Sequence, residues 1–220
     1  MNLNESAYEK IWRADSDRRG ALIVFCGPDG AGKTTQIRLL VERLRKEQRA
    51  VITTRQPTDW YRNNPTFQNY AATGTKTDHL FLALLAAADR RLHITEVVDP
   101  QLQAGHWVVS DRYVYSSLVY FAERGIDPNI VAQFNFDIPR PDLSVFLDVP
   151  ADILETRIEK RDGSAKKYEE RDRDRLERLR SNFQTIAQMD SSIVQVDGRM
   201  EDTEIHSVVL HRLRARGLLT

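Results

Sequence analysis

The chain has 220 residues, 41% of them apolar, which is enough for one α/β domain with a substantial core. Its 32 Lys and Arg residues balance its 32 Asp and Glu residues, so the composition argues against a global field that would hold nucleic acid or an acidic membrane. No apolar stretch approaches the roughly 18 residues that cross a bilayer, and residues 1–20 lack the apolar core of a signal peptide. We therefore expect a cytoplasmic protein without nucleic-acid or membrane partners, in which any recognition of a charged ligand depends on a local group of residues.

Residues 1–20 form an extension ahead of the first strand pattern, and we expect a short helix or a loose segment there. From residue 21 onwards, short runs rich in β-branched and aromatic residues alternate with longer helical patterns, which predicts a parallel sheet wrapped by helices in one domain, residues 21–220. The predicted strands are Leu22–Cys26, Val51–Thr54, Trp107–Ser110, Leu143–Leu147 and Ile193–Val196. The predicted helices are Lys33–Glu47, Asp78–Gln103, Tyr115–Arg124, Ala151–Lys160, Tyr168–Met189 and Thr203–Arg216.

Two segments interrupt this alternation. Thr54–Thr77 is polar and contains two prolines and four aromatic residues, which predicts a long loop, and the basic run Lys160–Lys167 predicts a hinge-like loop between two helices. Loops at the end of an α/β sheet are where ligands bind. The single cysteine, Cys26, falls in the first predicted strand, so we expect a small buried side chain without a catalytic role and no disulfide within the chain.

The segment from Gly27 to Thr34 matches the pattern G-x-x-x-x-G-K-[ST] and lies between the first predicted strand and the first long helix. Its glycines let successive backbone N–H groups point at one anion, and the start of the helix adds its positive dipole end. Lys33 is then placed to reach the β- and γ-phosphates of a nucleotide, and the Thr34 hydroxyl to ligate Mg²⁺. These features predict an α/β protein with the three-layer P-loop NTPase fold, in which a five-stranded parallel sheet is flanked by helices. The predicted ATP-binding residues are Gly27, Asp29, Gly30, Ala31, Gly32, Lys33, Thr34 and Thr35.

The run from Trp107 to Asp111 reads as a strand that ends in an acid, an arrangement that supplies a second ligand for Mg²⁺ or its waters. We therefore predict a Mg²⁺ site at Thr34 and Asp111. Phosphoryl transfer develops charge on oxygens, so a kinase needs cations around both the donor and the acceptor phosphates. Arg55 and Arg112 follow predicted parallel strands beside the phosphate-binding loop, which favours them as such cations.

With these motifs placed, the sequence resembles the thymidylate kinase family from Ala21 to about Arg214, leaving the N-terminal extension outside. The motifs that carry the resemblance are Gly-Pro-Asp-Gly-Ala-Gly-Lys-Thr-Thr at 27–35, Thr-Arg-Gln-Pro at 54–57, Ala-Ala-Asp-Arg at 87–90, Asp-Arg-Tyr-Val-Tyr-Ser-Ser-Leu-Val-Tyr at 111–120 and a lid-like segment at about 157–169.

The resemblance implies small-molecule nucleotide substrates and a set of acceptor-binding residues: Asp29, Arg55, Arg90, Arg112, Ser117 and Tyr120. In the family's arrangement the arginines at the two strand ends grip the acceptor phosphate, Arg90 faces the pyrimidine edge with Ser117 near the base, and Tyr120 packs against the sugar. The resemblance also implies a homodimer and Mg²⁺ as cofactor. It implies catalytic roles for Lys33, Arg112, Arg157 and Arg161, the last two reaching ATP from the lid because the phosphate-binding loop carries no arginine.

The sequence departs from the family pattern chiefly on the acceptor side. The family usually places a Phe that stacks on thymine four residues before Arg90, where this chain has Ala86, and such stacking contributes about 1–3 kcal/mol per base. Phe81 lies on another face of the predicted helix. Gln56 replaces a Glu, Tyr120 is followed by Phe-Ala rather than Gln-Gly, and Lys166-Lys167 replaces an Asp-Arg in the lid.

We therefore expect the reaction ATP + dTMP → ADP + dTDP. A kinase of the same build that acts on a modified pyrimidine monophosphate, dUMP or a nucleoside is an alternative, which Ala86 motivates. A nucleotide-binding switch that transfers no phosphate is a further alternative. The lack of an Asn-Lys-x-Asp guanine motif and the arginines on the acceptor side favour the kinase over the switch.

Overall fold

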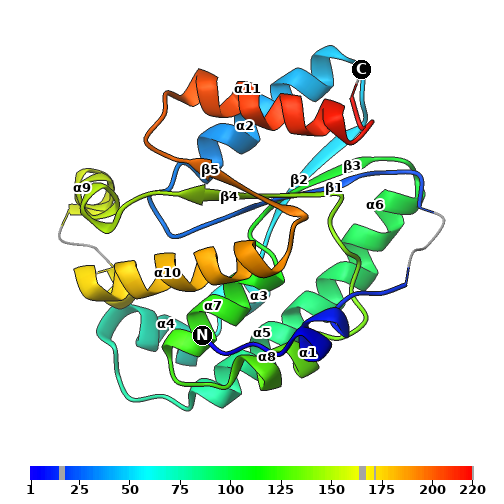
Figure 1. The fold of residues 1–220 in the computed structure, drawn as a ribbon. Helices are drawn as coiled ribbons and strands as arrows, with labels where there is room; N and C mark the ends of the chain where they lie inside the picture. The colour runs from blue at the N-terminus through cyan, green and yellow to red at the C-terminus, as the bar shows by residue number, and fades with distance from the viewer. Residues whose placement is uncertain (15–17, 164–166, 171, 220) are drawn as a thin grey trace.

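The computed structural model describes residues 1–14, 18–163, 167–170 and 172–219, and its centre is a five-stranded parallel sheet (Figure 1). The strands lie in the order β2-β3-β1-β4-β5, so β1 has β3 on one side and β4 on the other. Their bounds are β1 Leu22–Cys26, β2 Val51–Arg55, β3 Trp107–Asp111, β4 Leu143–Asp148 and β5 Ile193–Asp197. The predicted α/β fold class and the five predicted strands are confirmed. Four strands are one residue longer than predicted because each continues to a charged residue at its carboxyl end, namely Arg55, Asp111, Asp148 and Asp197.

Helices cover both faces of the sheet because strand side chains alternate between two cores. In β1, Val24 and Cys26 point into one core and Ile23 and Phe25 into the other. Helices α2 (Lys33–Lys46) and α11 (Asp202–Ala215) lie over the second core (Figure 1). The opposite face is covered by α5 (His79–His93), α7 (Val114–Glu123), α8 (Pro128–Phe134) and α10 (Arg173–Met189). The Cys26 thiol is buried as predicted, and its burial raises its pKa to about 12, so it remains a neutral packing group.

The long predicted helices are confirmed, with ends that differ by one or two residues, except that α10 begins at Arg173, five residues after the predicted start at Tyr168. Their bounds are α2 Lys33–Lys46, α7 Val114–Glu123, α9 Ala151–Asp162, α10 Arg173–Met189 and α11 Asp202–Ala215. The helix predicted over Asp78–Gln103 consists of α5 (His79–His93), a π-helical turn η1 (Ile94–Val98) and α6 (Asp99–Gln103). Ahead of α10 lies a short 3₁₀ helix, η3 (Tyr168–Glu170). Across the described ranges, no helix combines the length and the apolar character needed to cross a bilayer.

The long loop predicted over Thr54–Thr77 is wrong, because this segment contains α3 (Asp59–Arg62) and α4 (Pro65–Thr73). The Thr58 side chain caps α3, and the Asn64 side chain caps α4 ahead of a proline at its first position. Both caps can be read from the sequence, but helices of four and nine residues are too short to show a clear helical pattern of apolar residues. Helix α8 (Pro128–Phe134) was also not predicted, and α9 continues two residues into the segment predicted as a basic loop.

Residues 1–14 pack against the helical layer that holds α8 (Figure 1). They contain a short helix, α1 (Glu5–Glu9), as expected, and the side chains of Tyr8 and Ile11 are buried in the core. The Tyr8 hydroxyl donates a hydrogen bond of 2.6 Å to Asp190 at the end of α10. Residues 15–17 of the predicted extension and residues 164–166 of the predicted lid lie outside the described residues.

Candidate active site

The loop between β1 and α2 has the shape of an anion cradle. Gly27, Gly30 and Gly32 have φ values of 135°, 81° and 95°, which favour glycine. At Gly27 space is also limiting, since a Cβ atom would lie 3.0 Å from the Leu147 carbonyl oxygen. No side chain of the described residues caps the start of α2, so its first N–H groups are available to an anion. The loop after β1 and the first turn of α2 thus hold the predicted ATP-binding residues Gly27, Asp29, Gly30, Ala31, Gly32, Lys33, Thr34 and Thr35.

Lys33 is folded back onto this loop. Its ammonium group donates hydrogen bonds to the carbonyl oxygens of Gly27 at 3.1 Å and Pro28 at 2.8 Å, and it lies 3.8 Å from a carboxylate oxygen of Asp29. Burial, reinforced by the nearby Arg112 cation, lowers the pKa of Lys33 to about 8. A buried cation whose pKa is lowered by desolvation and by a neighbouring cation is stabilised when a polyanion replaces its carbonyl partners.

Asp111 ends β3 directly beside β1, in register with Phe25. Its Oδ1 atom is buried, and none of the residues that the structure describes hydrogen-bonds to it. Thr34 is the second residue of α2, directly after the phosphate-binding loop that follows β1. The described residues contain no cluster of three His, Cys, Asp or Glu side chains that would form an all-protein metal site. One carboxylate and one hydroxyl instead fit Mg²⁺, which usually takes one or two protein oxygens and completes its shell with water and substrate phosphates.

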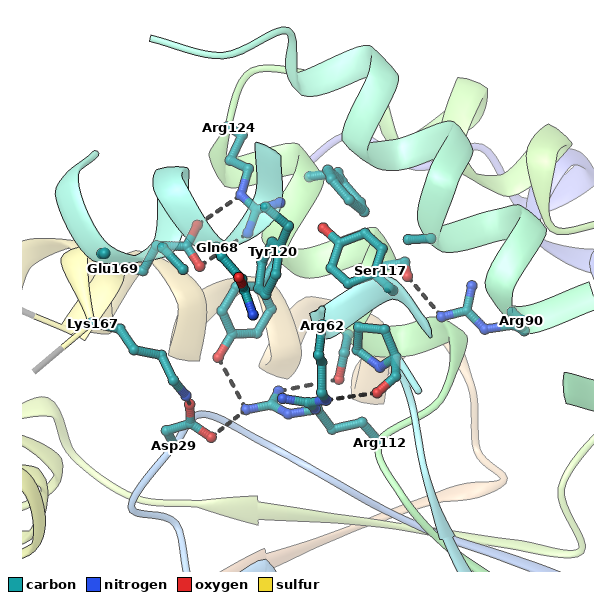
Figure 2. A pocket seen from close by; sticks show the side chains of 18 residues that line it. Asp29, Arg62, Gln68, Arg90, Arg112, Ser117, Tyr120, Arg124, Lys167 and Glu169 are labelled. Carbon is teal, nitrogen blue, oxygen red and sulfur yellow. Dashed lines mark hydrogen bonds and ion pairs between the residues drawn. The ribbon is translucent and has the colours of Figure 1, made fainter. Parts of the chain in front are cut away.

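Next to the phosphate-binding loop lies a cavity of about 550 Å³ (Figure 2). Its walls come from α3, α4, α5 and α7, and residues 167 and 169 line it from the side of the predicted lid. Most of the lining is apolar, while Asp29, Arg62, Arg112 and Lys167 gather at the end nearest the phosphate-binding loop (Figure 2). An apolar pocket with a few convergent polar groups is the usual form of a small-molecule site.

Arg112 joins the phosphate-binding loop to this cavity. Its Nη2 atom donates to Asp29 Oδ1 at 2.7 Å, and its guanidinium lies 5.2 Å from the ring centroid of Tyr120. From the other side, Lys167 donates to Asp29 Oδ2 at 2.8 Å. Burial acts to lower the pKa of Arg112, but Tyr120 and Asp29 raise it well above its usual value, so the residue stays a cation. Its φ of 70° is in the left-handed region, where a non-glycine residue is strained by about 1 kcal/mol or more, a feature typical of functional sites.

Arg90 lies in a buried network of neutral groups within the cavity wall. Its Nε atom donates to Gln56 Oε1 at 2.8 Å, Nη2 donates to Ser117 Oγ at 2.7 Å, and Nη1 donates to Asn135 Oδ1. The Gln56 amide nitrogen also lies 3.0 Å from Nδ1 of His93, so the amide makes one contact as an acceptor and one as a donor. A glutamate at this position would lack the donor. Burial lowers the pKa of Arg90 to about 10, which leaves it charged at neutral pH.

The other three predicted cations, Arg55, Arg157 and Arg161, do not line the cavity. Arg55 lies outside the cavity, is largely exposed and pairs with Asp59. Arg157 reaches the phosphate-binding loop, where its Nη1 atom donates to the Gly30 carbonyl oxygen at 3.4 Å. Arg161 turns to its neighbour Asp162, with bonds of 2.7 and 2.5 Å. The structure therefore brings Arg157 to the donor side and leaves Arg55 and Arg161 on the surface.

Sequence reasoning missed Arg62, which lies on α3 and lines the charged end of the cavity (Figure 2). Its Nε atom donates to the Pro57 carbonyl oxygen at 2.7 Å. Burial and the like charges of Arg112 and Arg55 lower the pKa of Arg62, which marks a local excess of positive charge. Recognising the Thr58 cap would have revealed α3 and placed Arg62 at the end of the single helical turn that follows β2. Two guanidinium groups at the end that meets the phosphate-binding loop are suited to a phosphorylated ligand.

A second missed feature is the buried ionic cluster around Glu169, which closes the cavity opposite the loop. Glu169 accepts hydrogen bonds from Arg124 at 2.7 and 3.0 Å, from Arg175 at 3.1 Å and from the Tyr70 hydroxyl at 2.9 Å. Burial acts to raise the pKa of Glu169, but Arg124 and then Arg175 bring it below its usual value. The cluster joins the start of α10 to α4 and α7. Its members are far apart in sequence, so no local pattern points to them.

A family model described as thymidylate kinase matches residues 25–209 of the chain. A protein named probable thymidylate kinase from Pyrococcus horikoshii is 36% identical over 203 residues, which cover 89% of this chain and 98% of that protein. A thymidylate kinase from a Sulfurihydrogenibium species is 33% identical, with 91% of this chain and 100% of that protein covered. A thymidylate kinase from Latilactobacillus sakei is 37% identical, with coverages of 77% and 82%.

Proposed function

The chain belongs to the thymidylate kinase family of ATP-dependent nucleoside monophosphate kinases, and from this premise we propose that it transfers the γ-phosphate of ATP to dTMP. The observation that carries the proposal is the hydrogen bond between Asp29 and Arg112. It joins the phosphate-binding loop to the cavity, so a donor phosphate in one and an acceptor phosphate in the other lie side by side. Positioning two reactants in this way is the main requirement of phosphoryl transfer.

In this proposal the chemistry is a direct in-line displacement. An oxygen of the acceptor phosphate attacks the γ-phosphorus of ATP, the bond from that phosphorus to the β-phosphate oxygen breaks, and ADP leaves. Lys33 turns from its carbonyl partners to the β- and γ-phosphates, while Arg112 and Arg62 hold the acceptor phosphate. No covalent intermediate and no strong base are needed, because the acceptor oxygen is already anionic at neutral pH.

Residues 157–169 act as a lid in this proposal. Of the two lid arginines, Arg157 is the better placed to meet the transferring phosphoryl group, because it already contacts the Gly30 carbonyl oxygen. Arg161 takes part only if closure draws it away from Asp162, and Arg55 reaches the acceptor phosphate only if it leaves Asp59. Both predicted roles stay predictions.

Thr34 and Asp111 would hold Mg²⁺, in keeping with the buried Asp111 oxygen that lacks a partner among the described residues. When bound, the ion neutralises charge that builds on the β- and γ-phosphates. The residues of this chain contribute the orientation: Asp111 is fixed by the pairing of β3 with β1, and Thr34 by the first turn of α2.

The acceptor base lies toward Arg90 and Ser117 in this proposal. A guanidinium that donates only to neutral partners among the described residues keeps its full positive charge, which favours a carbonyl edge such as that of thymine. Tyr120, held by Arg112, packs against the deoxyribose.

We also propose a homodimer formed through α5. Leu80, Phe81, Leu84 and Leu92 are each 40% to 47% exposed. Leu80 and Phe81 lie four and three residues before Leu84, and Leu92 follows Leu84 about two turns later, so the four side chains share one side of that helix. An apolar stripe of this kind is typical of a surface covered by a partner. Sedimentation of the wild type and of a Leu84→Glu variant tests this, since the charge should yield monomers.

The function itself is tested by a coupled ADP-release assay with Mg·ATP against dTMP, dUMP, 5-hydroxymethyl-dUMP, dCMP, UMP and thymidine. We expect dTMP to give the highest kcat/KM and to be required for ADP release. The second candidate, a kinase for another pyrimidine monophosphate, is favoured by one observation: Ala86 lines the cavity with no more than a methyl group. A preference for another acceptor would establish that candidate in place of ours. ADP release that ignores every acceptor would instead indicate a switch.

A further inference from the structure

The wall of the cavity that α5 provides offers no flat surface to a base. Ala86 lies one turn before Arg90 on the same face of the helix, is 3% exposed and contributes only a methyl group. Phe81 is 42% exposed and is not part of the cavity lining. A pyrimidine ring that meets Arg90 with its edge therefore needs an apolar partner from another element.

Four aromatic side chains among the described residues line the cavity, and three are already occupied. Tyr61 and Phe121 are 2% and 3% exposed, so little of either ring is open to a ligand. The ring of Tyr120 is partly buried and has two neighbours, the Arg112 guanidinium at 5.2 Å and the Phe183 ring at 6.5 Å from its centroid, and the proposed function assigns its remaining surface to the sugar. Phe67 on α4 is only partly buried, which leaves it as the aromatic ring with surface to offer.

Phe67 is held firmly enough to act as a binding surface. The Asn64 side chain, which caps α4, accepts a hydrogen bond from the Phe67 N–H at 3.3 Å and so fixes the backbone. The ring packs on the buried ring of Tyr61, with centroids 4.5 Å apart and planes inclined by 47°. Further along α4, the Tyr70 hydroxyl bonds to Glu169 at 2.9 Å, which anchors the helix across the cavity. A preordered ring costs little conformational entropy when a base packs on it.

We infer that Phe67 supplies the aromatic face on which the acceptor pyrimidine packs, so that base stacking in this chain comes from α4 in place of α5. The inference rests on the proposed function and names a binding residue for the same site. Neighbouring Ala71 and Ala72 also line the cavity and leave room beside the ring. Because stacking on a base contributes about 1–3 kcal/mol, its loss corresponds to about 5- to 150-fold in acceptor affinity.

The test is the KM for dTMP and the Kd for dTMP by calorimetry in wild type, Phe67→Ala and Phe67→Leu. We expect both variants to weaken dTMP by at least about fivefold while the KM for ATP changes less than twofold. Phe67→Leu keeps an apolar group against Tyr61, so an equal loss in that variant points to the flat ring and not to collapse of α4. Phe136→Ala is the matched control, since Phe136 is 57% exposed outside the cavity and its loss should leave dTMP binding unchanged.

The double variant Phe67→Ala/Ala86→Phe gives the sharpest outcome. Returning a ring to α5 should recover most of the lost dTMP affinity, which a variant that had only lost stability would not do. If the wild type phosphorylates dTMP and Phe67→Ala binds it within twofold of wild type, the inference is overturned and the proposed function stands. If the wild type prefers another pyrimidine monophosphate, the proposed function fails and the same variants test stacking with that acceptor. A wild type that binds no pyrimidine monophosphate overturns both.

Discussion

The phosphate-binding loop occupies the consecutive residues 27–35, whereas the acceptor cavity draws its lining from α3, α4, α5, α7 and the segment ahead of α10. The loop recognises phosphate largely through backbone N–H groups, which any sequence with the right glycines presents. The cavity recognises its ligand through side chains that only tertiary packing brings together. A motif therefore identifies the first region, and the three-dimensional structure is needed for the second.

The largest expected effect falls on the loop. Lys33→Ala should reduce kcat/KM for ATP by about 10³-fold, because the variant removes the cation that meets the β- and γ-phosphates. Its unfolding midpoint should not fall, since the removed ammonium group is buried and has a lowered pKa in the folded protein. Steady-state kinetics and thermal unfolding measure the two quantities. Activity within tenfold of wild type would show that the loop does not hold the donor phosphates.

The difference between a local motif and a site assembled by tertiary packing explains which parts of the molecule can be predicted from the sequence. The strands were predicted because five apolar runs are buried on both faces, and the loop because its spacing is local. Arg62 and Phe67 were missed because α3 and α4 are short, polar helices defined by the caps Thr58 and Asn64. Glu169 was missed for a different reason, since its partner Arg124 lies 45 residues away along the chain.

Substitutions around the acceptor cavity should lower the free energy of unfolding more than substitutions in the phosphate-binding loop. Glu169→Gln removes a carboxylate that is 15% exposed and bonded to two arginines, which leaves buried charge unpaired and should destabilise the protein by about 3 kcal/mol in urea unfolding. Because the pKa of Glu169 is below its usual value in the folded protein, this contribution is present above about pH 4.5 and is lost as the pH falls through the folded pKa. Glu177→Gln is the matched control, since its pair with Arg180 is exposed and its loss should cost less than about 0.5 kcal/mol. Equal effects of the two variants would contradict a structural role for the cluster.

A substitution at Arg62 should affect the binding of dTMP in the cavity and not the binding of ATP at the phosphate-binding loop. Arg62→Ala should raise the KM for dTMP by about 30-fold, the equivalent of about 2 kcal/mol for a charge-assisted hydrogen bond, and leave the KM for ATP within a factor of two. Arg55→Ala is its control because Arg55 lies outside the cavity and should change the KM for dTMP only a few-fold. A larger effect at Arg55 than at Arg62 would mean that closure rearranges the charged end of the cavity.

The smallest expected effect is a pH dependence confined to the donor side. In the form without ATP, Lys33 has a pKa of about 8, so it is charged below that pH and loses its proton above it. The value of kcat/KM for ATP at saturating dTMP should therefore fall on the alkaline side, by about tenfold at pH 9. Bound ATP phosphates raise the pKa of Lys33, so kcat and the kcat/KM for dTMP at saturating ATP should hold to higher pH.

The control is Lys33→Arg, which keeps its charge throughout this range, so that its residual kcat/KM for ATP should not fall on the alkaline side. A wild-type profile for ATP that stays flat to pH 9.5 would show that ATP meets an ammonium group with an ordinary pKa, because only a lowered pKa places the limb near pH 8.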